Sequence, residues 1–144
     1  MKQILSNDII NQYMPTLVKC PLFNTLGEPE LRSYLNNAKV IIHSYQKNDF
    51  IALAGDPMEG IGVILEGSAL LTRENVMGQR VIMANLEQSD IFGEALLFSK
   101  QPLWPATIKA TKATKIMFIP LETFIKTLPD CHQCQTKIQI GRAS

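Results

Sequence analysis

The feature that most constrains the fold is a series of short β-rich runs between Ala38 and about Ile119. Turn residues interrupt them every eight to twelve positions, and the runs read KVIIHSY, FIALAG, GIGVILEG, ALLTRE, RVIMANL and TKIMFIP. The reversals carry residues that accept a positive φ at little steric cost, namely Asn48-Asp49, Gly55-Asp56, Glu66-Gly67 and Met77-Gly78. This spacing predicts a β-sandwich or barrel.

Helical spacing occurs on both sides of the β region. Apolar residues recur at helical intervals behind Asn7, and Pro15 is expected to kink or end that helix. A second, short helix is predicted after Gly27, with Pro29 near its first turn. A further apolar stripe follows the β region, formed by Leu121, Phe124, Ile125 and Leu128. The predicted fold class is therefore mainly β with flanking helices.

Size and charge exclude several classes of protein. A chain of 144 residues with 46% hydrophobic content suits one compact domain. A net charge of +1, with scattered Lys and Arg, gives no general attraction to nucleic acid or anionic lipid. No apolar run approaches the ~20 residues of a membrane span, and the first residues lack a signal-peptide pattern. Three cysteines argue against a disulfide framework. We expect a soluble, cytoplasmic domain.

Four ordered blocks point to a known family. They read PLFNTLGEPELRSYLNNAKV, NDFIALAGDPMEGIGVILEGSALL, GQRVIMANLEQSDIFGEALLF and ATIKATKATKIMFIPLETF. Together they resemble the cyclic-nucleotide-binding domain, and most closely that of the Crp–Fnr family of bacterial transcription regulators, from about Pro21 to Leu128. The resemblance implies a double-stranded β-roll, or jelly roll, that holds a small-molecule effector. It also implies flanking helices and a long helix after the roll that forms a homodimer.

The resemblance sets the expected organisation of the chain. We expect an N-terminal helical segment over 1–36, the effector-binding β-roll over 37–120, and C-terminal helices over 121–144 that begin the dimerisation helix. A helix-turn-helix domain would normally follow. Because this chain ends at Ser144, we expect DNA contact only through a C-terminal domain that this chain does not contain. The near-neutral charge agrees with a sensor half, because the Lys and Arg residues that neutralise DNA phosphates would belong to the DNA-binding domain.

The stretch FGEALLF predicts an anion cradle. A strand ends at Phe92, Gly93 allows close approach, and the helix expected at EALLF offers free backbone N–H groups. Glu94 is suited to accept a hydrogen bond from a ligand hydroxyl such as a ribose 2′-OH. The resemblance implies these roles for Gly93 and Glu94, and Phe92 and Ala95 adjoin them as candidates. The alternative is structural: Gly93 makes a tight turn, and Glu94 caps its helix or pairs with a cation.

The decisive departure from the family pattern is Trp104-Pro105. Cyclic-nucleotide binders of the resembled family usually carry an Arg there, followed by a small hydroxyl residue or Ala. That arginine forks onto the cyclic phosphate, whereas Lys100 and Lys109 offer only point charges. A charged hydrogen bond contributes roughly 1.5–3 kcal/mol, so its loss weakens binding by about one to two decades. We therefore expect a non-nucleotide effector.

The expected pocket lies between Trp104 and the inner faces of RVIMANL and ATIKAT, and it suits an apolar or aromatic molecule with a modest polar handle. By position in the family pattern, the candidate lining residues are Met83, Ala84, Pro105, Ala106 and Thr107. One alternative is that Trp104 fills the cavity, which leaves a stand-alone interaction or dimerisation module without a ligand. Another is a true cyclic AMP or cyclic GMP domain, which ranks last because it needs the missing Arg.

Cofactor and enzyme chemistry find little support in the sequence. An iron–sulfur cluster needs four thiolates, and Cys20, Cys131 and Cys134 supply three. The lone C-x-x-C at 131–134 lacks the second pair of a structural metal site. His43 has no ligand partner at a recognisable spacing, which disfavours haem. No nucleophile elbow, P-loop or HExxH occurs. We expect no catalytic residue, no metal and no cofactor, and hence no enzyme.

Overall fold

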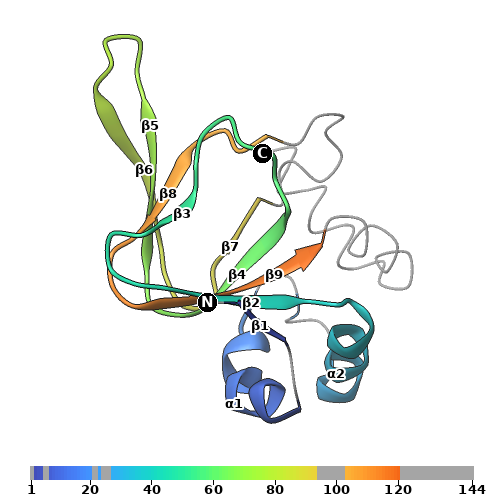
Figure 1. The fold of residues 1–144 in the computed structure, drawn as a ribbon. Coiled ribbons are helices and arrows are strands. Elements are labelled where there is room, and N and C mark those ends of the chain that lie inside the picture. Colours follow the sequence, from blue (N-terminus) through green and yellow to red (C-terminus); the bar gives the residue numbers. More distant parts are fainter. Residues whose placement is uncertain (1, 5–6, 21–22, 24–26, 94–102, 121–144) are drawn as a thin grey trace.

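Two antiparallel β-sheets form the body of the domain in the computed structural model, which describes residues 2–4, 7–20, 23, 27–93 and 103–120 (Figure 1). The five-stranded sheet has the order β1-β2-β9-β4-β7, and the four-stranded sheet has the order β3-β8-β5-β6. The elements are β1 (Lys2–Ile4), α1 (Asn7–Leu17), α2 (Glu28–Asn37), β2 (Ile41–Tyr45), β3 (Phe50–Ala52), β4 (Gly60–Glu66), β5 (Ala69–Glu74), β6 (Arg80–Leu86), β7 (Ile91–Phe92), β8 (Thr107–Ala110) and β9 (Thr114–Pro120). The predicted β-roll with flanking helices is confirmed.

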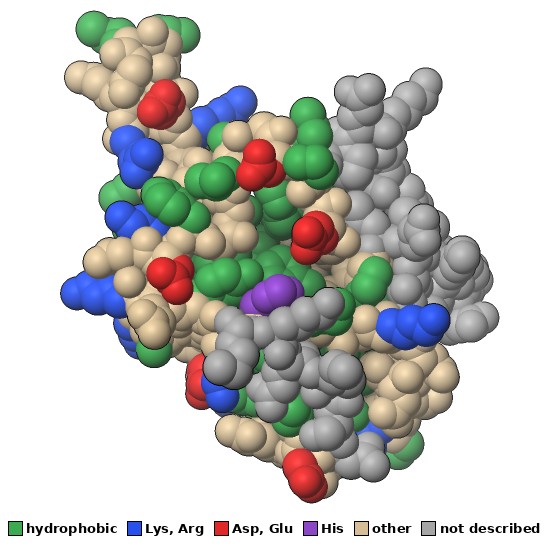
Figure 2. Space-filling model, in the orientation of Figure 1, with side chains coloured by type: hydrophobic (Ala, Val, Ile, Leu, Met, Phe, Trp, Pro, Cys, Tyr) green, Lys and Arg blue, Asp and Glu red, His purple; other side chains and the backbone are tan. Residues whose placement is uncertain are grey.

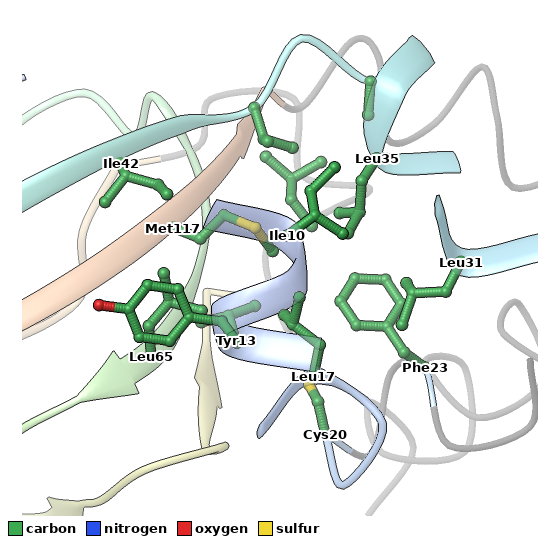
Figure 3. Packing of buried hydrophobic residues seen from close by; sticks show 14 of the residues in the cluster. Ile10, Tyr13, Leu17, Cys20, Phe23, Leu31, Leu35, Ile42, Leu65 and Met117 are labelled. Atoms are coloured by element: carbon green, nitrogen blue, oxygen red, sulfur yellow. The ribbon is translucent and has the colours of Figure 1, made fainter. Parts of the chain in front are cut away.

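The five-stranded sheet is covered on both faces, which explains the continuous apolar run GIGVILE. On one face of β4, Ile61, Val63 and Leu65 join the core formed with α1 and α2, whereas Ile64 faces the core between the two sheets. A strand buried on both sides has no polar face to alternate with. The helices cover the sheet from below in Figure 1, and Figure 3 shows Ile10, Tyr13 and Leu17 of α1 packed beside Met117 of β9.

The predicted helices lie close to where spacing placed them. Helix α1 continues two residues past Pro15, so the proline lies in its last turn and does not end it at once. Helix α2 begins after Gly27, whose extended backbone and following proline suit a helix start, and it buries Leu31 and Leu35. None of the described helices is long and apolar enough to span a membrane.

The N-terminal segment 1–36, expected as a helical segment, also contains a short strand before its first helix. Strand β1 pairs with β2 in antiparallel register, with Gln3 opposite Ile42. The backbone pairing to an open sheet edge decides the conformation of such a short stretch, and no local signal marks it. The helical segment predicted for 121–144, with Cys131 and Cys134, lies outside the described residues.

Candidate functional site

The floor of the candidate site is the turn that follows β7. Phe92 pairs with Gly62 of β4, and Gly93 then takes a φ of +94°, a left-handed conformation that favours glycine. This positive φ suits the tight turn given as the structural alternative for Gly93, which stays a prediction because the residues after it lie outside the described part of the chain. Glu94 and Ala95, the next candidates along the cradle, lie outside the described residues.

The indole of Trp104 packs directly over Gly93. A Cβ added to Gly93 would lie 3.4 Å from Cη2 and Cζ3 of Trp104 and 2.9 Å from Cε of Met58. The Trp104 side chain is 7% exposed, and its ring centroid lies 5.8 Å from that of Phe92. Phe92 in turn meets Phe118 edge to face at 6.0 Å. The space on the Cβ side of Gly93 is therefore occupied by the side chains of Met58 and Trp104.

The backbone on both sides of Trp104 is held by the loop after β3. The N–H of Trp104 donates to the carbonyl of Asp56 at 2.9 Å, and the N–H of Gly55 donates to the carbonyl of Trp104 at 2.8 Å. Gly55 has a φ of +91°, which lets the chain turn at this point without strain. Leu103 and Pro57 extend the pairing by one bridge. These bonds fix the backbone from which the Trp104 side chain projects, and packing on Gly93 and Phe92 places the indole.

Trp104 also forms one wall of a cavity of about 230 Å³ at the edge of the roll where β2 and β3 meet. The other aromatic walls are Tyr45, Phe50 and Phe118, and His43 lies among them, stacked on Tyr45 at 6.1 Å between centroids. The lining is completed by Ile51, Ala52, Leu53, Asp56, Pro57 and Glu59. Burial and the nearby charges of Glu59 and Asp49 raise the pKa of the Tyr45 hydroxyl to about 12.

The structure brings Phe92, Gly93 and Trp104 into contact with one another. Ala106, two residues after Trp104, is buried. Among the candidates that the structure describes, Trp104 alone lines the cavity of about 230 Å³. Pro105 and Thr107 line a different hollow on the four-stranded sheet, where Thr107 Oγ1 accepts the N–H of Ala54 at 3.2 Å.

Met83 and Ala84 were assigned to the pocket by family position. Ala84 pairs with Leu71, but the register of β5 and β6 then shifts, so Met83 has no partner across the ladder and its side chain is 55% exposed. Neither residue lines the cavity beside Trp104. Their role in effector binding stays a prediction.

The sequence interpretation missed Tyr45, Phe118, Asp56 and Glu59. The alternation of KVIIHSY and TKIMFIP would have assigned Tyr45 and Phe118 to a face opposite Ile42 and Met117. The alternation pattern does not show that β2 pairs with β9, and this pairing joins residues 41–45 to residues 114–118. The described residues contain no group of three or more His, Cys, Asp or Glu side chains suited to hold a metal ion.

Comparison with known proteins gives consistent matches. The sequence model of the cyclic nucleotide-binding domain matches residues 42–130. The cAMP-activated global transcriptional regulator CRP of Pasteurella multocida is 31% identical over 106 residues, which cover 72% of this chain and 50% of that protein. The cAMP-dependent protein kinase regulatory subunit of Dictyostelium discoideum is 30% identical over 84 residues, which cover 56% of this chain and 25% of that protein.

Among solved structures, the sensor domain of the transcriptional regulator DNR from Pseudomonas aeruginosa superposes with a TM-score of 0.80 at 17% identity. The match covers 94% of this chain and 89% of that domain. At this identity the likeness shows the fold alone. The match covers 50% of the length of the Pasteurella regulator and 25% of the length of the Dictyostelium regulatory subunit.

Proposed function

The chain belongs to the cyclic nucleotide-binding domain family, and from this premise we propose that it is the effector-sensing domain of a Crp/Fnr-type transcription regulator whose effector is not a cyclic nucleotide. The observation that carries the second half is the indole of Trp104 over Gly93, at 3.4 Å from the Cβ position. A phosphate brought there would have to displace a buried aromatic side chain, and Trp104 offers it no positive charge. A buried phosphate without a counter-charge is strongly disfavoured.

The relatives support the regulatory part of this proposal. The Pasteurella protein is named a transcriptional regulator, and the Pseudomonas domain is named a sensor domain of one. In such an arrangement a ligand shifts the population of two conformations and need not react. We assign DNA binding to a further domain of the full-length protein, and we expect the sensor to act as a homodimer, the commonest oligomer.

Titration with cyclic AMP and cyclic GMP tests the proposal. We expect no binding tighter than about 100 μM by calorimetry, because a lost forked arginine contact alone weakens binding by about one to two decades. The emission of Trp104, the single tryptophan, reports the same site independently. Saturable binding of either nucleotide at low micromolar concentration would overturn the assignment of a non-nucleotide effector.

Two substitutions separate charge from space. Trp104→Arg opens the volume over Gly93 and supplies a guanidinium, so we expect at least a tenfold gain in cyclic AMP affinity, the equivalent of about 1.4 kcal/mol. Trp104→Leu also opens volume but supplies no charge, and we expect no gain. Circular dichroism verifies that both variants fold. If neither variant binds better than the parent, Trp104 is not what keeps the nucleotide out.

A further inference from the structure

The cavity beside Trp104 has walls of a kind that recognise positive charge. Tyr45, Phe50, Trp104 and Phe118 contribute four aromatic rings to one volume of about 230 Å³. The faces of such rings carry negative electrostatic potential and attract ammonium and guanidinium groups. Phe50 already receives one cation in this structure, since Lys109 Nζ lies 5.6 Å from its ring centroid.

Two carboxylates stand at the rim of the same cavity. Asp56 and Glu59 line it, and none of its described lining residues is Lys or Arg. Within the described residues, Lys and Arg form ion pairs with Glu28 and Glu66, and no such pair holds Asp56 or Glu59. Figure 2 shows this face: hydrophobic side chains gather beside a histidine, acidic side chains stand around them, and Lys and Arg side chains lie farther out.

The electrostatic environment within the cavity agrees with this charge pattern. The pKa of the Tyr45 hydroxyl is raised, first by burial and then by the negative charges of Glu59 and Asp49. Burial is the larger cause, and the two carboxylates add negative charge near the Tyr45 hydroxyl. The described lining residues include two carboxylates, His43 and no Lys or Arg, so fixed negative charge exceeds fixed positive charge around the cavity. His43 itself stacks on Tyr45 and meets Phe118 edge to face.

We propose that this cavity binds a small organic ammonium ion, with its charged group between the aromatic walls of Tyr45, Trp104 and Phe118 and facing the carboxylates of Asp56 and Glu59. The inference rests on the proposed function, because it names the chemical class of the non-nucleotide effector. The volume sets the size: 230 Å³ lies below the range of about 300–1,000 Å³ that accommodates drug-sized ligands. A ligand in contact with Trp104 would also affect the loop after β3, because the backbone of Trp104 is hydrogen-bonded to Gly55 and Asp56 in that loop.

The test compares two molecules of the same shape that differ in charge. Choline is the cationic probe, and 3,3-dimethyl-1-butanol is its neutral carbon analogue. At constant ionic strength, choline is expected to change the Trp104 emission saturably and to bind at least about tenfold more tightly than the neutral alcohol. Equal affinities would show an apolar pocket without charge recognition and would overturn the proposal, as would the absence of a saturable response to choline.

A matched pair of variants links the response to the rim. The double variant Asp56→Asn, Glu59→Gln keeps shape and removes both charges, so choline affinity should fall about tenfold or more while the far-ultraviolet spectrum is unchanged. The control Glu74→Gln removes an exposed carboxylate on β5 outside this lining and should leave choline binding as it was. Unchanged affinity in the double variant would contradict the role of the rim.

The outcome can be separated from that of the proposed function. Micromolar binding of cyclic AMP to the unaltered chain would refute the non-nucleotide assignment, whatever choline does. Failure of choline with no nucleotide binding would refute only the ammonium proposal and leave a different non-nucleotide effector in place.

Discussion

Trp104→Ala is expected to lower the free energy of unfolding by about 3–5 kcal/mol, the usual cost of truncating a large buried aromatic residue. The indole is 7% exposed and packs on Phe92, Gly93 and Met58. Its neighbours are held by two sheets and cannot collapse fully into the space, so a residual cavity adds to the lost burial. Urea unfolding followed by circular dichroism measures the change, since the variant has no tryptophan.

Two further variants calibrate this measurement. Val76→Ala alters a fully exposed side chain in the β5–β6 connection and should change the unfolding free energy by no more than about 0.5 kcal/mol. Trp104→Phe keeps an aromatic ring and should fall between the parent and Trp104→Ala. A loss below about 1 kcal/mol for Trp104→Ala would show that the indole is not part of the core and would also weaken the argument that it blocks the cradle.

Much of the fold follows from the sequence because strand and turn chemistry is local. The glycines expected to take positive φ at 55, 67 and 78 do so, and six predicted β-rich runs each contain a strand. Strand β1 escaped prediction because its conformation depends on pairing with β2, far along the chain. The same dependence on distant partners hid Tyr45 and Phe118 as cavity walls.

The candidate site divides in the same way. Trp104 could be singled out from the sequence, since the family resemblance predicts an arginine at its position. The orientation of its indole over Gly93 could not, because it depends on Met58 and on pairing with Asp56. Asp56 and Glu59 lie in a loop with no spacing signal, and only the fold sets them beside Tyr45 and Trp104.

Gly62→Val is expected to lower the free energy of unfolding by about 3 kcal/mol, the upper part of the usual range for an overpacked core. Gly62 faces Phe92 across the β4–β7 pair, and even a Cβ at this position would overlap the phenyl ring. That ring cannot move away freely, because Trp104 lies on one side of it and Phe118 meets it edge to face. The displacement should therefore pass to Trp104 and change its emission.

The control and the rescue make this prediction specific to the contact. Gly27→Ser adds a Cβ in ordinary contact, with Pro29 Cδ at 3.8 Å as its nearest neighbour, and a preferred helix-capping side chain, so we expect no loss of stability. The double variant Gly62→Ala, Phe92→Leu should be more stable than the sum of the single changes predicts, because the smaller side chain removes the overlap. Additive losses in this cycle would mean that Gly62 is required for its backbone and not for the close approach of Phe92, and Phe92 would then not be the link between β4 and the indole of Trp104.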